Sequence, residues 1–318
     1  MTSDEVLAFR NWYERAGVRQ TPRRWLAADD DLSGYAFFPR HLIPHMNHPA
    51  VTADPNLARY LEAQYLFQWL NFTAHFEVRV VNRATHMIAT GGSGVSCPPD
   101  MQQAAFQIYV DEGYHSLYSL DMVRQLEERT QIIAVPYDFD EYLRNLDAVG
   151  AEYTGYEKLV RLLQVVTFET LVTGILLDIP NDPTVIPAVR QIVKDHAIDE
   201  GRHHRYFAAF FLRLWGGFTA AERQMVAGWL PDLILQSLQP ATTPTANALR
   251  AVGMSDDSVT EIVAESFTDT SVISGIRRAS VNTVRLFQSA GILDTHEGHD
   301  AFARVGLAPQ EGAGRSGE

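Results

Sequence analysis

Cysteine, positive charge and long apolar runs are all scarce in this sequence. The single cysteine, Cys97, excludes an intrachain disulfide, and no ligand pattern surrounds it that would indicate a structural zinc or iron–sulfur site. With 39 acidic against 26 basic residues, the chain has a formal net charge of −13 and lacks the basic face that binds nucleic acid or anionic lipid. The sequence therefore predicts neither partner.

Targeting segments and strand patterns are missing as well. The first five residues, MTSDE, lack the basic start and apolar core of a signal peptide. No uncharged apolar run reaches the roughly 18 residues that a membrane span needs. We therefore expect a soluble, cytoplasmic protein without a membrane partner. No segment alternates convincingly between apolar and polar residues, so no β-sheet is predicted.

Apolar and aromatic residues instead recur every three or four positions, which is typical of amphipathic helices. Four long helices are predicted at about 57–89, 100–130, 152–177 and 187–215, with Asp100 as the N-cap of the second. Shorter helical stretches are predicted at 219–238, 246–253 and 258–290. Residues 1–56, rich in proline and aromatics, are expected to wrap the surface after a short helix, and 309–318 to form a disordered tail.

A five-residue motif, Asp-Glu-Gly-x-His, occurs twice, at residues 111–115 and 199–203. Each copy lies in the middle of a predicted helix. Residues three apart lie on the same helix face, so each copy directs a carboxylate and an imidazole the same way: Glu112 with His115, and Glu200 with His203. Two copies on different helices are much more specific than one.

Ferritin-like di-iron bundles carry such a Glu-x-x-His pair on two helices and one inward glutamate on each of the other two. Glu77 lies within the aromatic stripe of the first predicted helix. Glu169 is the only charged residue between Arg161 and Asp178 on the third, where an unpaired buried charge would be costly. Four glutamates also balance the charge of two Fe(II) ions. The sequence predicts an all-α, ferritin-like four-helix bundle, core about 57–215, within one di-iron oxygenase domain of residues 1–308.

Three further residues accompany the second and first motifs. His196 precedes Glu200 by four positions and His203 by seven, so it shares their helix face. It is either a seventh ligand or a histidine that lies beside the site or on the surface. Asp111 and Asp199 are expected to accept an N–H from a ligand histidine and fix its orientation, the alternative being an ordinary solvent-facing aspartate.

With these residues in order, the sequence resembles the p-aminobenzoate N-oxygenase family over roughly residues 35–290. The resemblance implies that Glu77, Glu112, His115, Glu169, His196, Glu200 and His203 all bind metal. It implies two iron ions, dioxygen as co-substrate, an external electron donor and a homodimer. The implied reaction converts a small-molecule amine to a hydroxylamine, nitroso or nitro product, in natural-product biosynthesis.

The substrate contacts are predicted less directly. The resemblance implies a carboxylate-binding arginine in the region of Arg277 and Arg278, and the alternative for each is a solvated or ion-paired arginine. Trp69 and Thr73 precede Glu77 by eight and four positions and share its face. They either line a substrate pocket or belong to the apolar core.

Other functions use the same ligands. A di-iron C–H hydroxylase or desaturase remains an alternative, as does an iron-storage or radical-cofactor protein. Storage proteins stop soon after the four-helix core, whereas this chain continues to further predicted helices. A radical site needs a tyrosine beside the metals: Tyr114 and Tyr118 flank the first motif, but Tyr114 points away from the face that carries Glu112 and His115. A purely structural bundle would leave Glu169 unexplained.

Overall fold

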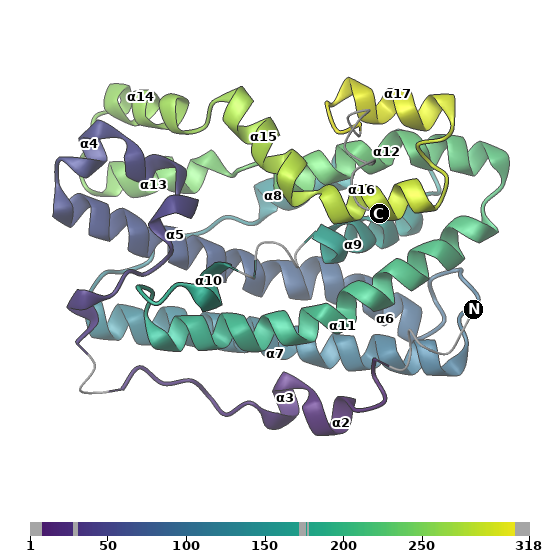
Figure 1. The fold of residues 1–318 in the computed structure, drawn as a ribbon, viewed down its shortest axis with the longest axis horizontal. Helices are drawn as coiled ribbons and strands as arrows, with labels where there is room; N and C mark the ends of the chain where they lie inside the picture. Colours follow the sequence, from purple (N-terminus) through teal and green to yellow (C-terminus); the bar gives the residue numbers. More distant parts are fainter. Residues whose placement is uncertain (1–7, 28–30, 172–175, 177, 309–318) are drawn as a thin grey trace, which may run out of the picture.

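The protein is a bundle of helices in a computed structural model that describes residues 8–27, 31–171, 176 and 178–308 (Figure 1). Within these residues the only β-type pairing is one isolated parallel bridge between Ala36 and Val185. The predicted all-α fold class is confirmed. The predicted tail at 309–318 lies outside the described residues.

Four long helical segments build the core, close to the predicted positions. The first consists of α5 (Pro55–Phe76), a π-helical turn labelled η4 (Glu77–Val81) and α6 (Asn82–Ala89). The others are α7 (Pro99–Thr130), α9 (Glu157–Leu171) and α11 (Pro187–Gly217). The third begins later than predicted, and most of its predicted end, at 172–177, lies outside the described residues.

Prolines fix where three of these helices start, because proline has no N–H to lose in a first turn. Pro55, Pro99 and Pro187 each occupy the first turn. The Asp54 side chain caps α5 by accepting the backbone N–H groups of Asn56 and Leu57. The prediction that Asp100 caps α7 is wrong. Pro98 stands at that position, and Asp100 lies inside the first turn.

The π-helical turn interrupts the first core helix at a predicted site residue. The backbone N–H of Asn82 donates to the carbonyl of Glu77, five residues back, instead of the α-helical four. One extra residue is thereby accommodated, which rotates the helix face that follows. Such turns occur frequently at functional sites, and this one begins at Glu77.

Additional helices cover one side of the bundle (Figure 1). They are α8 (Asp140–Ala148), α12 (Ala220–Leu238), α13 (Thr242–Ala251), α14 (Asp256–Ser266), α15 (Asp269–Ala279), α16 (Val281–Ser289) and α17 (His296–Arg304), with the short α10 (Asp178–Asn181) before α11. Sequence reasoning did not predict α8 and α17. The single stretch predicted at 258–290 is three helices, because the backbone leaves helical geometry at Phe267 and turns again at Ser280.

The first part of the N-terminal segment, residues 8–27, crosses the opposite side, outside α7 and α11, and its last part reaches α5 and α14 (Figure 1). The whole segment contains α2 (Trp12–Arg15), α3 (Gly17–Gln20), α4 (Pro49–Thr52) and the 3-10 turns η1 (Leu32–Gly34), η2 (Arg40–Leu42) and η3 (Pro44–Asn47). It does more than wrap the surface, since Phe9, Trp12 and Phe37 are buried in the core.

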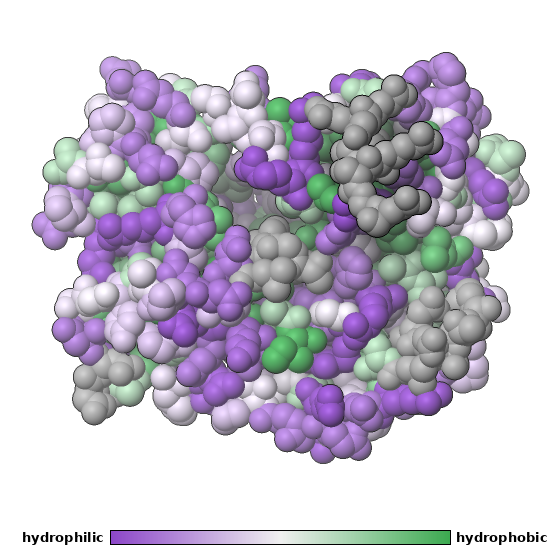
Figure 2. Space-filling model, viewed as in Figure 1, coloured by the Kyte–Doolittle hydropathy of each residue, from purple (hydrophilic) through white to green (hydrophobic). Residues whose placement is uncertain are grey.

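The molecular surface is largely polar on the face that Figure 2 shows, with only small separate hydrophobic areas. Among the described residues, none of the helices combines the length and apolar character that crossing a membrane requires.

Glu62 on α5 anchors the N-terminal segment. Its fully buried carboxylate accepts the backbone N–H of Phe37 at 2.6 Å and Nε of Arg40 at 3.0 Å. Glu62→Leu leaves the buried N–H of Phe37 without an acceptor and removes the ion pair with the exposed Arg40, so we expect the free energy of unfolding to fall by about 2–3 kcal/mol. Urea unfolding would show a lower midpoint at an unchanged slope.

The matched control is Glu261→Leu, on the exposed face of α14. A surface change of this kind is expected to alter the unfolding free energy by less than about 0.5 kcal/mol. If Glu62→Leu were as stable as this control, Glu62 would not be an anchor.

Candidate metal centre

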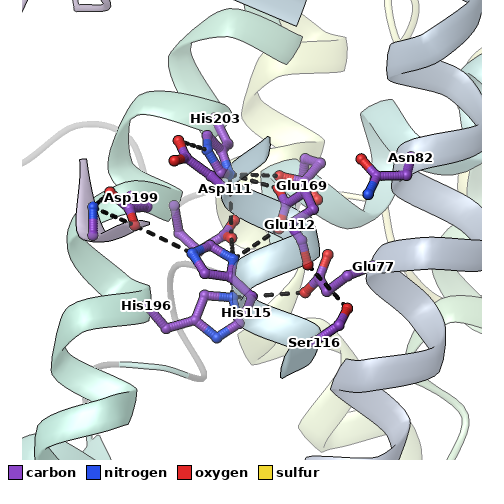
Figure 3. Close-up of polar contacts among 12 residues, drawn as sticks. Glu77, Asn82, Asp111, Glu112, His115, Ser116, Glu169, His196, Asp199 and His203 are labelled. Atoms are coloured by element: carbon purple, nitrogen blue, oxygen red, sulfur yellow. Dashed lines mark hydrogen bonds and ion pairs between the residues drawn. The ribbon is translucent and has the colours of Figure 1, made fainter. Parts of the chain in front are cut away.

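Four helical segments bring seven buried acidic and histidine side chains together in the middle of the bundle (Figure 3). All seven are at most 4% exposed. Glu77 comes from the π-helical turn, Glu112 and His115 from α7, Glu169 from α9, and His196, Glu200 and His203 from α11. These are the seven residues predicted from the sequence.

The seven side chains form two overlapping groups, each with ligand atoms within 4.8 Å of one another. The first group contains Glu77, Glu112, His115, His196 and Glu200, and the second contains Glu112, Glu169, Glu200 and His203. Glu112 and Glu200 belong to both. The arrangement therefore suits two neighbouring cations that share two carboxylates.

In the second group, atoms lie close without forming hydrogen bonds. Nδ1 of His203 is 2.7 Å from Oε1 of Glu112, 3.3 Å from Oε1 of Glu200 and 4.0 Å from Oε2 of Glu169. Nevertheless, Nδ1 of His203, Oε1 of Glu112 and Oε2 of Glu169 have no hydrogen-bond partner among the described residues. Donor atoms that converge on one point in this way fit a metal ion between them.

The first group is equally compact. His115 Nδ1 lies 2.8 Å from Oε2 of Glu112, and His196 Nε2 lies 3.0 Å from Oε1 of Glu200 and 3.6 Å from Oε1 of Glu77. The two imidazole rings are 4.1 Å apart between centroids. Oε2 of Glu77 and Oε2 of Glu200 have no hydrogen-bond partner among the described residues. His196 thus lies with the ligand candidates and not on the surface.

The pKa shifts of the cluster indicate that its buried carboxylates lack compensating positive charge when no metal is bound. Burial, reinforced by the neighbouring carboxylates, raises the pKa of Glu77 and of Glu169 well above the ordinary value. Burial opposes ionisation of Glu200 too, but His203 and His196 outweigh it and lower the pKa of that carboxyl. Burial opposes protonation of His115 and of His203, but the neighbouring carboxylates outweigh it and raise the pKa of both imidazoles. Protons on these imidazoles and on the carboxyls of Glu77 and Glu169 therefore offset the negative charge, and bound metal would displace them.

Each histidine of the two motifs contacts the aspartate of the other motif. His115 Nε2 lies 3.2 Å from Oδ2 of Asp199, and His203 Nε2 lies 3.3 Å from Oδ2 of Asp111. With each Nε2 directed at an aspartate, the Nδ1 atom of each histidine faces the shared glutamates. The two contacts tie α7 and α11 together.

Sequence reasoning missed the part played by the N-terminal segment. Trp12 donates its indole N–H to Oδ2 of Asp111 at 2.8 Å, and the backbone N–H of Gly17 donates to Asp199 at 3.2 Å. A Cβ on Gly17 would lie 2.6 Å from Oδ2 of Asp199, so the close approach requires glycine. The aromatic content of residues 1–56 was the only sequence signal, and it did not indicate these partners.

The predicted substrate residues do not belong to either of the two ligand groups. Thr73 is buried on α5, and Trp69 is partly buried with its ring 6.1 Å from that of Phe38. Arg277 and Arg278 are exposed near the end of α15. The first donates to the Gly306 carbonyl and the second to Oγ of Ser274 at 2.9 Å. Their proposed contacts with substrate stay predictions.

A helical bundle with a buried carboxylate–histidine cluster at its centre is typical of the ferritin-like class. The chain belongs to the p-aminobenzoate N-oxygenase family: the family model described as p-aminobenzoate N-oxygenase AurF matches residues 10–291. Membership makes this chain an oxygenase by family. The match also includes the segment that holds Trp12 and Gly17. A search of curated proteins found no match.

We expect Asp111→Asn to weaken metal binding. The asparagine oxygen can still accept hydrogen bonds from Trp12 and His203. The negative charge is lost, however, and an amide N–H₂ replaces Oδ1, which has no hydrogen-bond partner among the described residues. Loss of such an orienting group costs about 10–100-fold in metal affinity. Anaerobic competition for Fe(II) against a chelator measures it. Asp257→Asn, exposed on α14, is the control, and equal affinities of the two variants would contradict the role of Asp111.

Proposed function

We propose that this protein is a di-iron, dioxygen-dependent N-oxygenase that converts an amine to a hydroxylamine, nitroso or nitro product. The observation that carries the proposal is the pair of overlapping ligand groups joined by Glu112 and Glu200. Membership of the p-aminobenzoate N-oxygenase family supports the reaction type.

Iron is the metal that this donor set favours. The groups offer carboxylate oxygens and imidazole nitrogens without thiolate, and such mixed ligation with open positions suits oxygen-activating iron. Four glutamates carry four negative charges, which two Fe(II) ions neutralise. Buried carboxylates without donors are costly, and the ions remove that cost. When bound, the iron pair supplies the activation of dioxygen.

The two groups are unequal, and the inequality indicates where exogenous molecules bind. The first group has five residues, including two histidines, and the second has four with one histidine. A metal bound by Glu169 and His203 would therefore have fewer protein ligands. We assign dioxygen and the amine nitrogen to that side of the pair.

An aromatic wall beside the glutamates excludes water from the site. Phe76 precedes Glu77, Phe168 precedes Glu169, and the two phenylalanine rings lie 3.7 Å apart between centroids. Phe72 packs against both rings. A dry surrounding strengthens the interactions of the buried charges and limits side reactions with solvent.

The substrate is a small-molecule amine. Trp69, Thr73, Arg277 and Arg278 remain its predicted contacts, the arginines for a substrate carboxylate. An external electron donor, a homodimeric assembly and a place in natural-product biosynthesis complete the proposal, and all three rest on the family resemblance.

The proposal predicts that the protein binds two irons per chain and consumes dioxygen after anaerobic reduction. With ¹⁸O₂ and a panel of amines that includes p-aminobenzoate, mass spectrometry should find the label on nitrogen. Label on carbon would favour a C–H hydroxylase instead. A protein with fewer than two irons, or one whose reduced form ignores dioxygen, would exclude this function.

His196→Ala tests whether the third histidine is a ligand. Its Nε2 lies 3.0 Å from Glu200 and 3.6 Å from Glu77, so its loss should weaken one of the two iron-binding steps by about tenfold or more, or at least about 1.4 kcal/mol. His299→Ala, an exposed histidine on α17, is the control. Unchanged iron content and affinity in His196→Ala would show that His196 does not bind metal.

A further inference from the structure

A continuous line of contacts leads from the protein surface to one metal-facing histidine. Nδ1 of His203 faces the shared glutamates, while its Nε2 lies 3.3 Å from Oδ2 of Asp111. The same oxygen accepts the indole N–H of Trp12 at 2.8 Å. The ring of Tyr13 then meets that of Trp12 edge-on, with centroids 5.2 Å apart. Trp12 is 7% exposed, but Tyr13 is 55% exposed.

The other aspartate–histidine pair has no such connection. Asp199, which contacts His115, accepts from the backbone N–H of Gly17 and from the Arg202 guanidinium. Neither group is an aromatic ring that could relay an electron. Although the two motifs are identical in pattern, only the aspartate that contacts His203 accepts a hydrogen bond from an aromatic side chain. His115 meets the ring of Tyr118 at 5.5 Å and Tyr118 meets that of Tyr114 at 5.4 Å, but the Tyr118 hydroxyl has no hydrogen-bond partner among the described residues.

An electron route is needed because no donor can touch the centre. All seven candidate ligands are at most 4% exposed, and a carrier protein stops at the molecular surface. Electrons cross such a distance more readily through bonds, hydrogen bonds and ring contacts than through empty space. We propose that Tyr13, Trp12 and Asp111 form the path by which electrons reach the iron at His203.

This inference rests on the proposed di-iron function, and the electron balance is that of amine oxygenation. One amine, one O₂, two electrons and two protons give one hydroxylamine and one water. Each electron leaves a reduced carrier and is gained by a ferric ion. Trp12 and Tyr13 pass it on without any bond being made or broken, and the protons come from solvent.

The charge around Tyr13 indicates the kind of carrier. The protein is strongly acidic, with a net charge of −13, yet residues 10–24 contain five arginines and one glutamate. Arg10, Arg15 and Arg19 are exposed, and none forms an ion pair with another described residue. This local basic surface fits a small electron-carrier protein with an acidic face, which complementary charge would steer to Tyr13.

The test measures two half-reactions by anaerobic stopped flow, with reduced plant-type ferredoxin as the probe. The Trp12→Phe variant keeps an aromatic ring at this position but loses the indole N–H that donates to Asp111. Reduction of the diferric protein should slow by about tenfold, which corresponds to about 1.4 kcal/mol of activation free energy. The rate at which chemically pre-reduced protein consumes dioxygen should fall much less. Trp25→Phe, an exposed tryptophan of the same segment, is the control and should reduce at the wild-type rate.

Charge reversal provides a second test at residues that do not contribute to the core. Arg10→Glu with Arg15→Glu should slow reduction by ferredoxin and flatten its dependence on salt, because screened attraction is lost. Metal analysis will show whether Trp12→Phe binds its iron. If it binds too little, the double arginine variant tests the electron route instead.

Different results would contradict the electron route and the di-iron function. Reduction of iron-loaded Trp12→Phe at the wild-type rate, or a wild-type protein that ferredoxin does not reduce, contradicts the proposed route. A wild-type protein that binds no iron pair, or whose reduced form does not consume dioxygen, contradicts the proposed function itself.

Discussion

Four glutamate side chains are buried in the centre of one helical bundle, and the arrangement around them depends on compensating their charge. Without a cation, the protein can do so only by protonating carboxyls and imidazoles, as the opposed pKa shifts of Glu77 and Glu200 indicate. Glu112 and Glu200 belong to both ligand groups, and each of the remaining ligand candidates belongs to only one of the two. Every helix that carries a ligand candidate must therefore keep its rotation and depth in the bundle.

Several local features maintain that geometry. The π-helical turn changes the helix register from Glu77 onward. Crossed contacts from His115 to Asp199 and from His203 to Asp111 link α7 and α11 at the level of the candidate ligands. The N-terminal segment then binds the outer side of both aspartates through Trp12 and Gly17. A segment far from the ligands in sequence thus supports the orientation of two of them.

Predictions from sequence were accurate where a local pattern decides the structure. Apolar stripes gave the four core helices to within a few residues, except for the later start of the third, and first-turn prolines account for three of their beginnings. The lone charge at Glu169 identified it as an inward residue, and the structure buries it at 1% exposure. Predictions failed where several elements compete. The cap of α7 falls at Pro98 instead of Asp100, and the stretch at 258–290 breaks into three helices.

By itself, the sequence determined the all-helical class and the residues with metal-binding chemistry, because helical spacing fixes which side chains share a face. Only the tertiary structure decided which glutamates are shared, which histidine nitrogen faces them, and that Trp12 reaches Asp111 across 99 positions of the chain. It also left Arg277 and Arg278 exposed. These outcomes depend on how helices pack against one another, and no pattern within a single helix encodes that packing.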